Sequence, residues 1–184
     1  MSQSAKTAIG SMVAALSVVI MIPTALDVFC YALPAIAAML ILFCVIEIDR
    51  KWAFGVFAVT ALISMLFVPN KEAAVLYTCF FGYYPIVKSI VESKLPIVLE
   101  YIVKLAVFNG AVVVAYMIVI NVLGMPIDEL LDMGENAFLN KYALPIMLLT
   151  GNVAFLVLDK AMTRMATVYI VVWQKKFRKM FPFK

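Results

Sequence analysis

The chain has 184 residues, of which 66% are hydrophobic and 14% are charged. Soluble domains average about 45–50% apolar and about 25% charged residues, so this composition leaves too little polar surface to cover a soluble protein. The sequence contains no histidine, which excludes Ser-His-Asp and Cys-His hydrolases, H-E-x-x-H peptidases and His-ligated zinc sites. The remaining interpretation is one domain, residues 1–184, embedded in a lipid bilayer.

Polar and turn residues divide the chain into six apolar stretches, each near the roughly 20 residues that a membrane-spanning helix needs. The predicted fold is therefore all-α, a polytopic membrane protein with six transmembrane helices. The predicted spans cover about residues 7–22, 28–46, 52–68, 73–90, 96–123 and 142–163. Residues 164–184 are expected to form a basic amphipathic tail that lies along the membrane surface.

The positions of the lysines and arginines predict the orientation of these spans. With six spans both termini lie on one side, and ten basic residues fall on that side against two, Lys71 and Lys141, on the other. Cytoplasmic loops carry the excess of basic residues, so both termini are predicted to be cytoplasmic. The expected location is a cell membrane, in the multi-pass form typical of the bacterial cytoplasmic membrane.

Several functions are not expected from this sequence. The net charge of +4 is explained by basic residues beside anionic lipid, so no nucleic-acid partner is predicted. There is no G-x-x-x-x-G-K-[ST] or G-x-G-x-x-G segment, so energy would have to come from a partner or an ion gradient. Cys30, Cys44 and Cys79 lie in apolar runs and are interpreted as packing residues. We predict no metal, no cofactor and no catalytic residue.

Three polar residues fall near the middle of the predicted membrane: Tyr83, Asn109 and Asn152. Polar groups at this depth are costly unless they are paired. They could hydrogen-bond to one another and hold spans four to six together, or they could line a ligand pocket with Tyr84 or Cys79 at its rim. Pro85 is predicted to interrupt the fourth helix, because proline lacks the amide proton that a helix interior needs.

Charged residues gather near the cytoplasmic ends of spans five and six. Glu100 and Lys104 are spaced i,i+4 in the favourable order, and Asp159, Lys160 and Arg164 lie at a similar depth in the sixth span. We predict an ion-pair cluster in which Asp159 and Glu100 neutralise Lys160 and Arg164. Lys104 is expected to depend less on pairing, since a long side chain can extend to water.

The first span carries a face of small residues. Gly10-x-x-x-Ala14 and Ser11-x-x-x-Ala15 are small-xxx-small patterns, which let two helices approach closely. The face could pack inside the protein or could dock a membrane partner.

This layout resembles the substrate-binding (S) components of energy-coupling factor vitamin transporters. The resemblance rests on six spans in under 200 residues, cytoplasmic termini, a small-residue first helix and a basic C-terminal end. It implies that Gly10, Ser11, Ala14 and Ala15 dock a membrane coupling subunit that works with ATPases. It also implies that Tyr83, Tyr84, Asn109 and Asn152 lie near a vitamin-like ligand. The rod-shape membrane protein of the cell-elongation machinery is similar in length and span count.

Two functions therefore stay open from the sequence. The first is a small-molecule binding and transport component that works with a separate energising module. The alternative is a non-catalytic membrane scaffold or assembly protein of the bacterial cell envelope. An enzyme is not predicted, because the predicted spans have no carboxylate cluster at mid-depth.

Overall fold

A computed structural model describes residues 2–26, 29–122, 124 and 143–176, and all regular structure within them is helical. The helices follow one another with short connections: α1 Gln3–Met21, η1 Ile22–Ala25, α2 Ala32–Glu47, α3 Arg50–Phe67, α4 Lys71–Leu76, η3 Tyr77–Phe81, α5 Tyr84–Lys94, α6 Ile97–Asn121, α9 Ala143–Val168 and η4 Tyr169–Trp173. The prediction of an all-α protein is confirmed.

Four helical segments in the described ranges are long and apolar enough to cross a membrane: Gln3–Ala25, Arg50–Phe67, Lys71–Lys94 and Ile97–Asn121. The second predicted span, 28–46, corresponds to α2, which begins only at Ala32 and has 16 residues. At about 1.5 Å per residue α2 is about 24 Å long, shorter than a hydrocarbon core of about 30 Å. The sixth predicted span, 142–163, corresponds to α9, which carries three charged residues in its second half: Asp159, Lys160 and Arg164.

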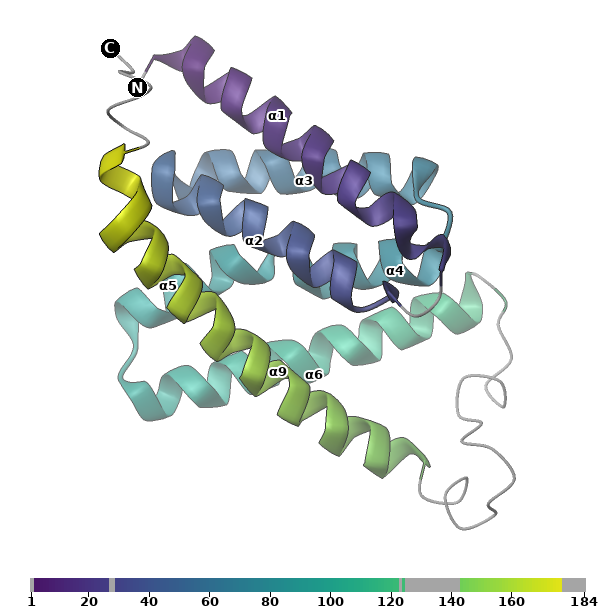
Figure 1. The fold of residues 1–184 in the computed structure, drawn as a ribbon. Helices are drawn as coiled ribbons and strands as arrows, with labels where there is room; N and C mark the ends of the chain where they lie inside the picture. The colour runs from purple at the N-terminus through teal and green to yellow at the C-terminus, as the bar shows by residue number, and fades with distance from the viewer. Residues whose placement is uncertain (1, 27–28, 123, 125–142, 177–184) are drawn as a thin grey trace.

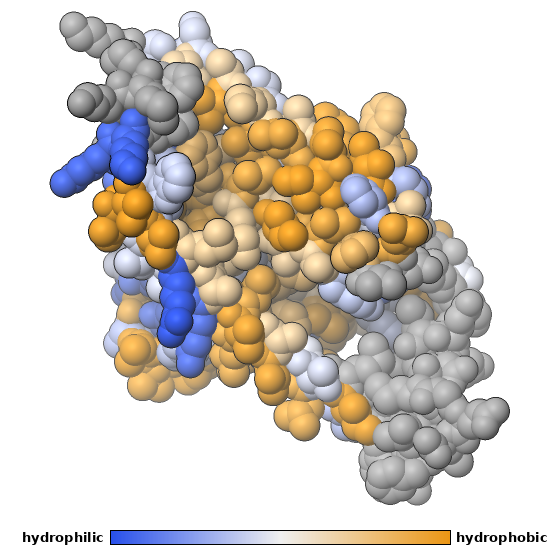
Figure 2. Space-filling view, in the orientation of Figure 1, coloured by the Kyte–Doolittle hydropathy of each residue, from blue (hydrophilic) through white to orange (hydrophobic). Residues whose placement is uncertain are grey.

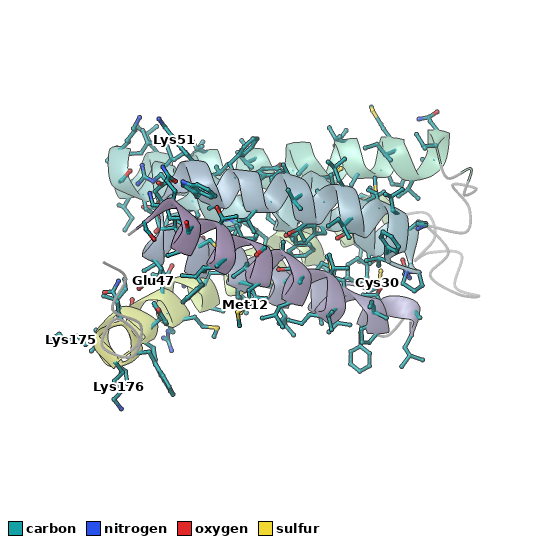
Figure 3. All side chains as sticks on the ribbon, turned by 90° about the horizontal axis from the view of Figure 1, so that it is seen from above. Met12, Cys30, Glu47, Lys51, Lys175 and Lys176 are labelled. Atoms are coloured by element: carbon teal, nitrogen blue, oxygen red, sulfur yellow. The ribbon has the colours of Figure 1, made fainter. Side chains whose placement is uncertain are left out.

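Successive helical segments alternate in direction, so their ends gather at the two ends of a bundle (Figure 1). The beginning of α1, the α2–α3 turn, the α5–α6 turn and the end of η4 lie at one end, and Lys6 Nζ lies 3.7 Å from Asp49 Oδ2 there. Figure 3 shows Lys51, Lys175 and Lys176 at this end and Cys30 at the other. We call the first end the basic end.

Of the predicted surface tail, residues 164–176 continue the last helix through η4, and residues 177–184 lie outside the described residues. Lys175 and Lys176 project from the end of this helix (Figure 3). Residues 125–142, which connect the fifth and sixth predicted spans, also lie outside the described residues.

The first three helices pack closely because small residues line their contacts. Gly10 and Ala14 of α1 are buried, and a Cβ atom on Gly10 would lie 3.0 Å from Val56 Cγ2 of α3. On α3 the buried face also includes Thr60 and Ser64, whose hydroxyls donate to backbone carbonyls one turn earlier at 2.8 and 2.6 Å. These local hydrogen bonds let polar residues lie between apolar helices without an unpaired donor.

Two helix starts at opposite ends of α3 are fixed by caps that the sequence supplies. Asp49 Oδ1 accepts a hydrogen bond from Trp52 N at 2.9 Å, and Asn70 Oδ1 accepts one from Ala73 N at 3.0 Å. Such side chains satisfy amide protons that have no partner inside the helix. The Trp52 amide holds the pKa of the Asp49 carboxyl below its usual range, because it stabilises the charged form.

The fourth helical segment is interrupted near its middle, as predicted from Pro85. Pro85 occupies the first turn of α5, and the preceding π-helical turn η3 closes with a hydrogen bond from Gly82 N to Tyr77 O at 2.7 Å. Because Pro85 cannot donate a backbone hydrogen bond, the helix widens before it and restarts at Tyr84. This break decides which face of α5 turns toward the bundle.

Apolar side chains cover much of the visible surface, as expected for contact with lipid tails (Figure 2). Large exposed apolar residues occur on α1, α3, α6 and α9, for example Met12, Leu62, Val98 and Val157. Blue side chains interrupt this surface on α9 (Figure 2). The molecule therefore has an apolar exterior, and most of its described ionic contacts lie inside the bundle.

We predict that Gly82→Ala destabilises the protein, whereas Gly110→Ala does not. A Cβ atom on Gly82 would lie 2.5 Å from Phe57 Cδ2 and 2.9 Å from Tyr77 Cε1, whereas one on Gly110 meets nothing within 4 Å. Overpacking of this kind costs about 1–3 kcal/mol. Unfolding of the two variants in detergent, followed by circular dichroism, measures the difference, and equal midpoints would contradict the packing at Gly82.

Candidate functional site

The α5–α6 hairpin brings charged residues together near the basic end. Leu95 and Pro96 are extended and separate the two helices, since the residue before a proline disfavours the helical region. The chain then reverses, so Glu92 near the end of α5 comes beside Glu100 and Lys104 in the first turns of α6. The extended backbone between α5 and α6 therefore brings Glu92, Glu100 and Lys104 together.

Two lysines share three carboxylates in what we call the charged cluster: Lys88, Glu92, Glu100, Lys104 and Asp159. Lys88 Nζ lies 2.5 Å from Asp159 Oδ1 and 2.5 Å from Glu92 Oε1. Lys104 Nζ lies 2.6 Å from Glu100 Oε1, 2.7 Å from Glu92 Oε1 and 3.1 Å from Asp159 Oδ2. The cluster joins α5, α6 and α9.

The centre of the charged cluster is enclosed by protein. Lys88, Lys104 and Asp159 are only 2%, 1% and 3% exposed, and the Tyr84 hydroxyl donates a further hydrogen bond to Asp159 Oδ1 at 2.5 Å. Buried charges are costly unless they are paired and hydrogen-bonded. Asp159 meets this condition with both oxygens, and Lys104 meets it with three acceptors. With two lysines against three carboxylates, the ionised cluster carries a formal charge of −1.

An aromatic layer lies next to the charged cluster on the side away from the basic end. Phe108 and Phe155 are stacked, with ring centroids 4.8 Å apart and an interplanar angle of 11°. Phe80 meets both rings edge-on, at 5.1 and 5.8 Å, and Tyr84 lies 4.9 Å from Phe80. This apolar layer separates the charged cluster from the polar residues predicted at mid-depth.

Asn109 and Asn152 form hydrogen bonds to each other between α6 and α9. Asn109 Nδ2 donates to Asn152 Oδ1 at 2.9 Å, and Asn152 Nδ2 donates to Asn109 Oδ1 at 3.2 Å. Each amide also donates to a carbonyl on its own helix, that of Leu105 or Leu148, at 2.8 Å. Of the two alternatives for these asparagines, the structure places them in an interhelical amide pair between α6 and α9.

Tyr83 does not join this pair, so Tyr83, Asn109 and Asn152 do not come together as both alternatives required. Its ring meets Phe57 of α3 edge-on, with centroids 6.0 Å apart. The interruption before Pro85 rotates the helix so that Tyr84, not Tyr83, points toward α9. Tyr84 lies at the charged cluster rather than at the rim of a mid-membrane pocket.

The predicted ion pairs of Lys160 and Arg164 are also wrong. Both side chains lie on the exposed side of α9, and no ion pair joins either residue to a carboxylate of the described chain. Asp159 points the opposite way, into the bundle, because consecutive helical residues differ by about 100° in direction. Lys104, expected to extend to water, is instead the most enclosed cation of the cluster.

The small-residue face of α1 is divided between two surroundings. Gly10 and Ala14 are buried against the neighbouring helices, whereas Ser11 and Ala15 are exposed. The Ser11 hydroxyl donates to Ala8 O at 3.0 Å. Two of the four residues that the resemblance assigned to a coupling subunit, Gly10 and Ala14, therefore pack inside the protein. Ser11 and Ala15 remain accessible.

A groove opens beside the charged cluster, between α2, α5 and the C-terminal part of α9. Its volume is about 360 Å³, within the range of about 300–1,000 Å³ typical of small-molecule sites. Apolar residues of α2 and of the last helix form part of the wall, and polar residues of α5 and α9 form the rest. The lining residues are Leu42, Val45, Ile46, Lys88, Ser89, Glu92, Ser93, Thr163, Ala166, Thr167 and Ile170.

Sequence reasoning missed Lys88 and Glu92, neither of which it assigned to the ion-pair cluster. Tyr84, Lys88 and Glu92 are spaced by four, which places them on one helical face. They also precede the α5–α6 turn at about the distance by which Glu100 and Lys104 follow it. Those two spacings together could have identified the face of α5 that completes the cluster.

In the described part of the chain, no three His, Cys, Asp or Glu side chains come close enough to hold a metal ion. No protein-family model, curated protein or solved structure matches the chain.

We predict that Lys104→Met destabilises the protein strongly, whereas the same substitution at Lys160 does not. Loss of Lys104 leaves carboxylates buried without their shared cation, and breaking a buried pair in this way costs about 3–5 kcal/mol. Lys160 is exposed, and surface changes usually stay within about 0.5 kcal/mol. Chemical unfolding in detergent measures both variants. Similar losses at the two positions would contradict the cluster.

Proposed function

We propose that this chain is a small-molecule binding component of a cell membrane, working in transport with a separate energising module. The observation that carries the proposal is the groove of about 360 Å³, in which Glu92, Lys88 and several hydroxyls stand opposite an apolar wall. Ionisable residues within membrane helices are costly and commonly mark paths for substrates or ions. A mostly apolar groove with a few polar groups is typical of small-molecule sites.

The proposed topology has six spans with both termini in the cytoplasm. The alternating direction of the helical segments supports it (Figure 1), as does the gathering of basic residues at one end. In this topology α2 and α9 cross the membrane with the four longer segments, and the groove opens near the cytoplasmic face. A ligand in the groove would then be accessible from that side.

An energising partner is proposed because the chain has no phosphate-binding loop of its own. Ser11 and Ala15 are small and exposed on α1, which would allow close approach of a partner helix. We propose this strip as the docking position of a membrane coupling subunit, as in the S components that the sequence resembles.

A scaffold of the cell envelope is the second candidate, and the charged cluster favours it. Asp159 and Lys104 are fully paired within the protein. Holding α5, α6 and α9 together is therefore a sufficient role for these charges. The two functions differ in one measurable property, because a scaffold needs no ligand in the groove.

The topology predicts that reporter fusions after Lys141 and after Lys184 lie on opposite sides of the membrane. Residue 141 precedes the last helix and residue 184 follows it, and the ten-to-two distribution of basic residues places the C-terminus in the cytoplasm. Paired phosphatase and fluorescent-protein fusions measure this. Activity on the same side for both fusions would show that α9 does not cross.

The binding function predicts that the purified protein retains a small molecule that mass spectrometry detects after denaturation. Ala166→Leu, which fills the groove from α9, should lower the retained amount, because the larger side chain occupies ligand volume. Ala106→Leu adds the same side chain at an exposed position of α6 that does not line the groove, and should retain the wild-type amount. No retained molecule, or equal amounts in both variants, would favour the scaffold.

A further inference from the structure

The polar groups that line the groove indicate the chemical class of ligand that it would bind. Glu92 Oε1 accepts from both Lys88 and Lys104 at 2.5 and 2.7 Å, whereas Oε2 has no hydrogen-bond partner among the described residues. The Glu92 side chain is 35% exposed and lines the groove. One carboxylate oxygen of the negatively charged cluster is therefore free to bind a donor.

The hydroxyls of the groove also favour a ligand that donates hydrogen bonds, because most of these hydroxyls donate their own protons to backbone carbonyls within the helices. Thr163 Oγ1 donates to Asp159 O at 3.0 Å, and Thr167 Oγ1 donates to Thr163 O at 2.9 Å, so both oxygens keep their lone pairs as acceptors. Ser93 Oγ donates to Ile90 O at 2.9 Å and already accepts from Arg50 Nη2 at 3.1 Å, so it keeps one lone pair. The groove thus presents several acceptors to a ligand.

Donors on the groove wall are fewer and less accessible. Lys88 already binds two carboxylates, and its side chain is 3% exposed. Ser89 can still offer its own hydroxyl proton, since its oxygen accepts from Arg50 Nε at 2.8 Å. Arg50 Nη2 also donates to Ser89 O at 2.9 Å and to Ser93 Oγ at 3.1 Å, so its donors are used by residues at the edge of the groove. Arg50, Lys160 and Arg164 themselves do not line the groove.

We propose that the groove binds a protonated amine attached to an apolar body, an inference that rests on the proposed binding function. The ammonium group donates to Glu92 Oε2 and to the hydroxyl oxygens of α9, and its charge balances the formal −1 of the charged cluster. The apolar body lies against Leu42, Val45 and Ile46 of α2. Either a free organic amine or the ethanolamine head group of a membrane lipid has this chemistry.

The test compares three probes of similar shape on the full chain in phosphatidylcholine nanodiscs: 2-phenylethylamine, 2-phenylethanol and 3-phenylpropanoate. Titration calorimetry should give binding of the amine and about tenfold or more weaker binding of the alcohol and the acid. Glu92→Gln should weaken amine binding about tenfold or more, because the amide cannot balance the charge. Glu72→Gln, a carboxylate near the opposite end of the bundle, should leave amine binding unchanged.

A second variant keeps the test independent of the ion pairs, since Glu92→Gln also alters contacts of Lys88 and Lys104. Ala166→Leu touches no member of the charged cluster through a hydrogen bond, and it should also weaken amine binding about tenfold or more. Unchanged amine affinity in either Glu92→Gln or Ala166→Leu would overturn the proposed site.

Nanodiscs that contain phosphatidylethanolamine distinguish the two sources of the amine. Retention of this lipid by the wild type but not by Ala166→Leu in native mass spectrometry, with weaker binding of 2-phenylethylamine, assigns the site to the head group. Undiminished probe binding and no retained lipid assign it to a free amine.

Two other results separate the failure of this inference from that of the proposed function. Binding of the acid or the alcohol but not the amine, lost in Ala166→Leu, would overturn the amine while leaving small-molecule binding in place. Binding of no probe and retention of no lipid would overturn the amine site, and would overturn the binding function as well if the purified protein also retains no small molecule.

Discussion

The cost of burying charge in an apolar surrounding is the constraint on which this structure depends. Lys88, Lys104 and Asp159 lie inside a bundle whose exterior is apolar, so each must find an opposite charge within reach. The observed arrangement of α5, α6 and α9 brings all three to shared partners, and the short α5–α6 hairpin supplies Glu92 and Glu100 to the same place. Apolar contacts between membrane helices are weakly directional, because lipid tails compete for them. Ion pairs therefore add specificity to the packing of these three helices.

Around this cluster, the other contacts between helices depend on the size and shape of the side chains. Small residues allow α1 to approach α3, with Gly10 against Val56. Gly82 leaves room for the rings of Phe57 and Tyr77 beside the π-helical turn. Because that turn precedes Pro85, Tyr84 turns toward Asp159 while Tyr83 turns toward α3. One proline thus determines which of two adjacent tyrosines takes part in the polar interior.

The groove lies where this polar interior reaches the surface. Glu92 belongs to both, since its Oε1 accepts from the buried lysines and the residue lines the groove. A charged ligand there would change the electrostatic balance of residues that connect three helices. Binding and the packing of α5, α6 and α9 would then be energetically linked, since a ligand shifts an equilibrium between conformations by its differential affinity for them.

The helical class and the approximate positions of the helices could be predicted from the sequence, since apolar stretches of membrane length end at charges, prolines and cap residues such as Asp49 and Asn70. It also placed Glu100, Lys104 and Asp159 near the same end of the membrane, and Asn109 and Asn152 at a common depth. The partners that these residues take depend on how the helices pack. Depth along a helix can be counted from sequence, but the direction of a side chain around the helix depends on interruptions such as the one before Pro85. For that reason Lys88 and Glu92 enter the cluster, Lys160 and Arg164 stay outside it, and Tyr83 lies apart from the asparagines.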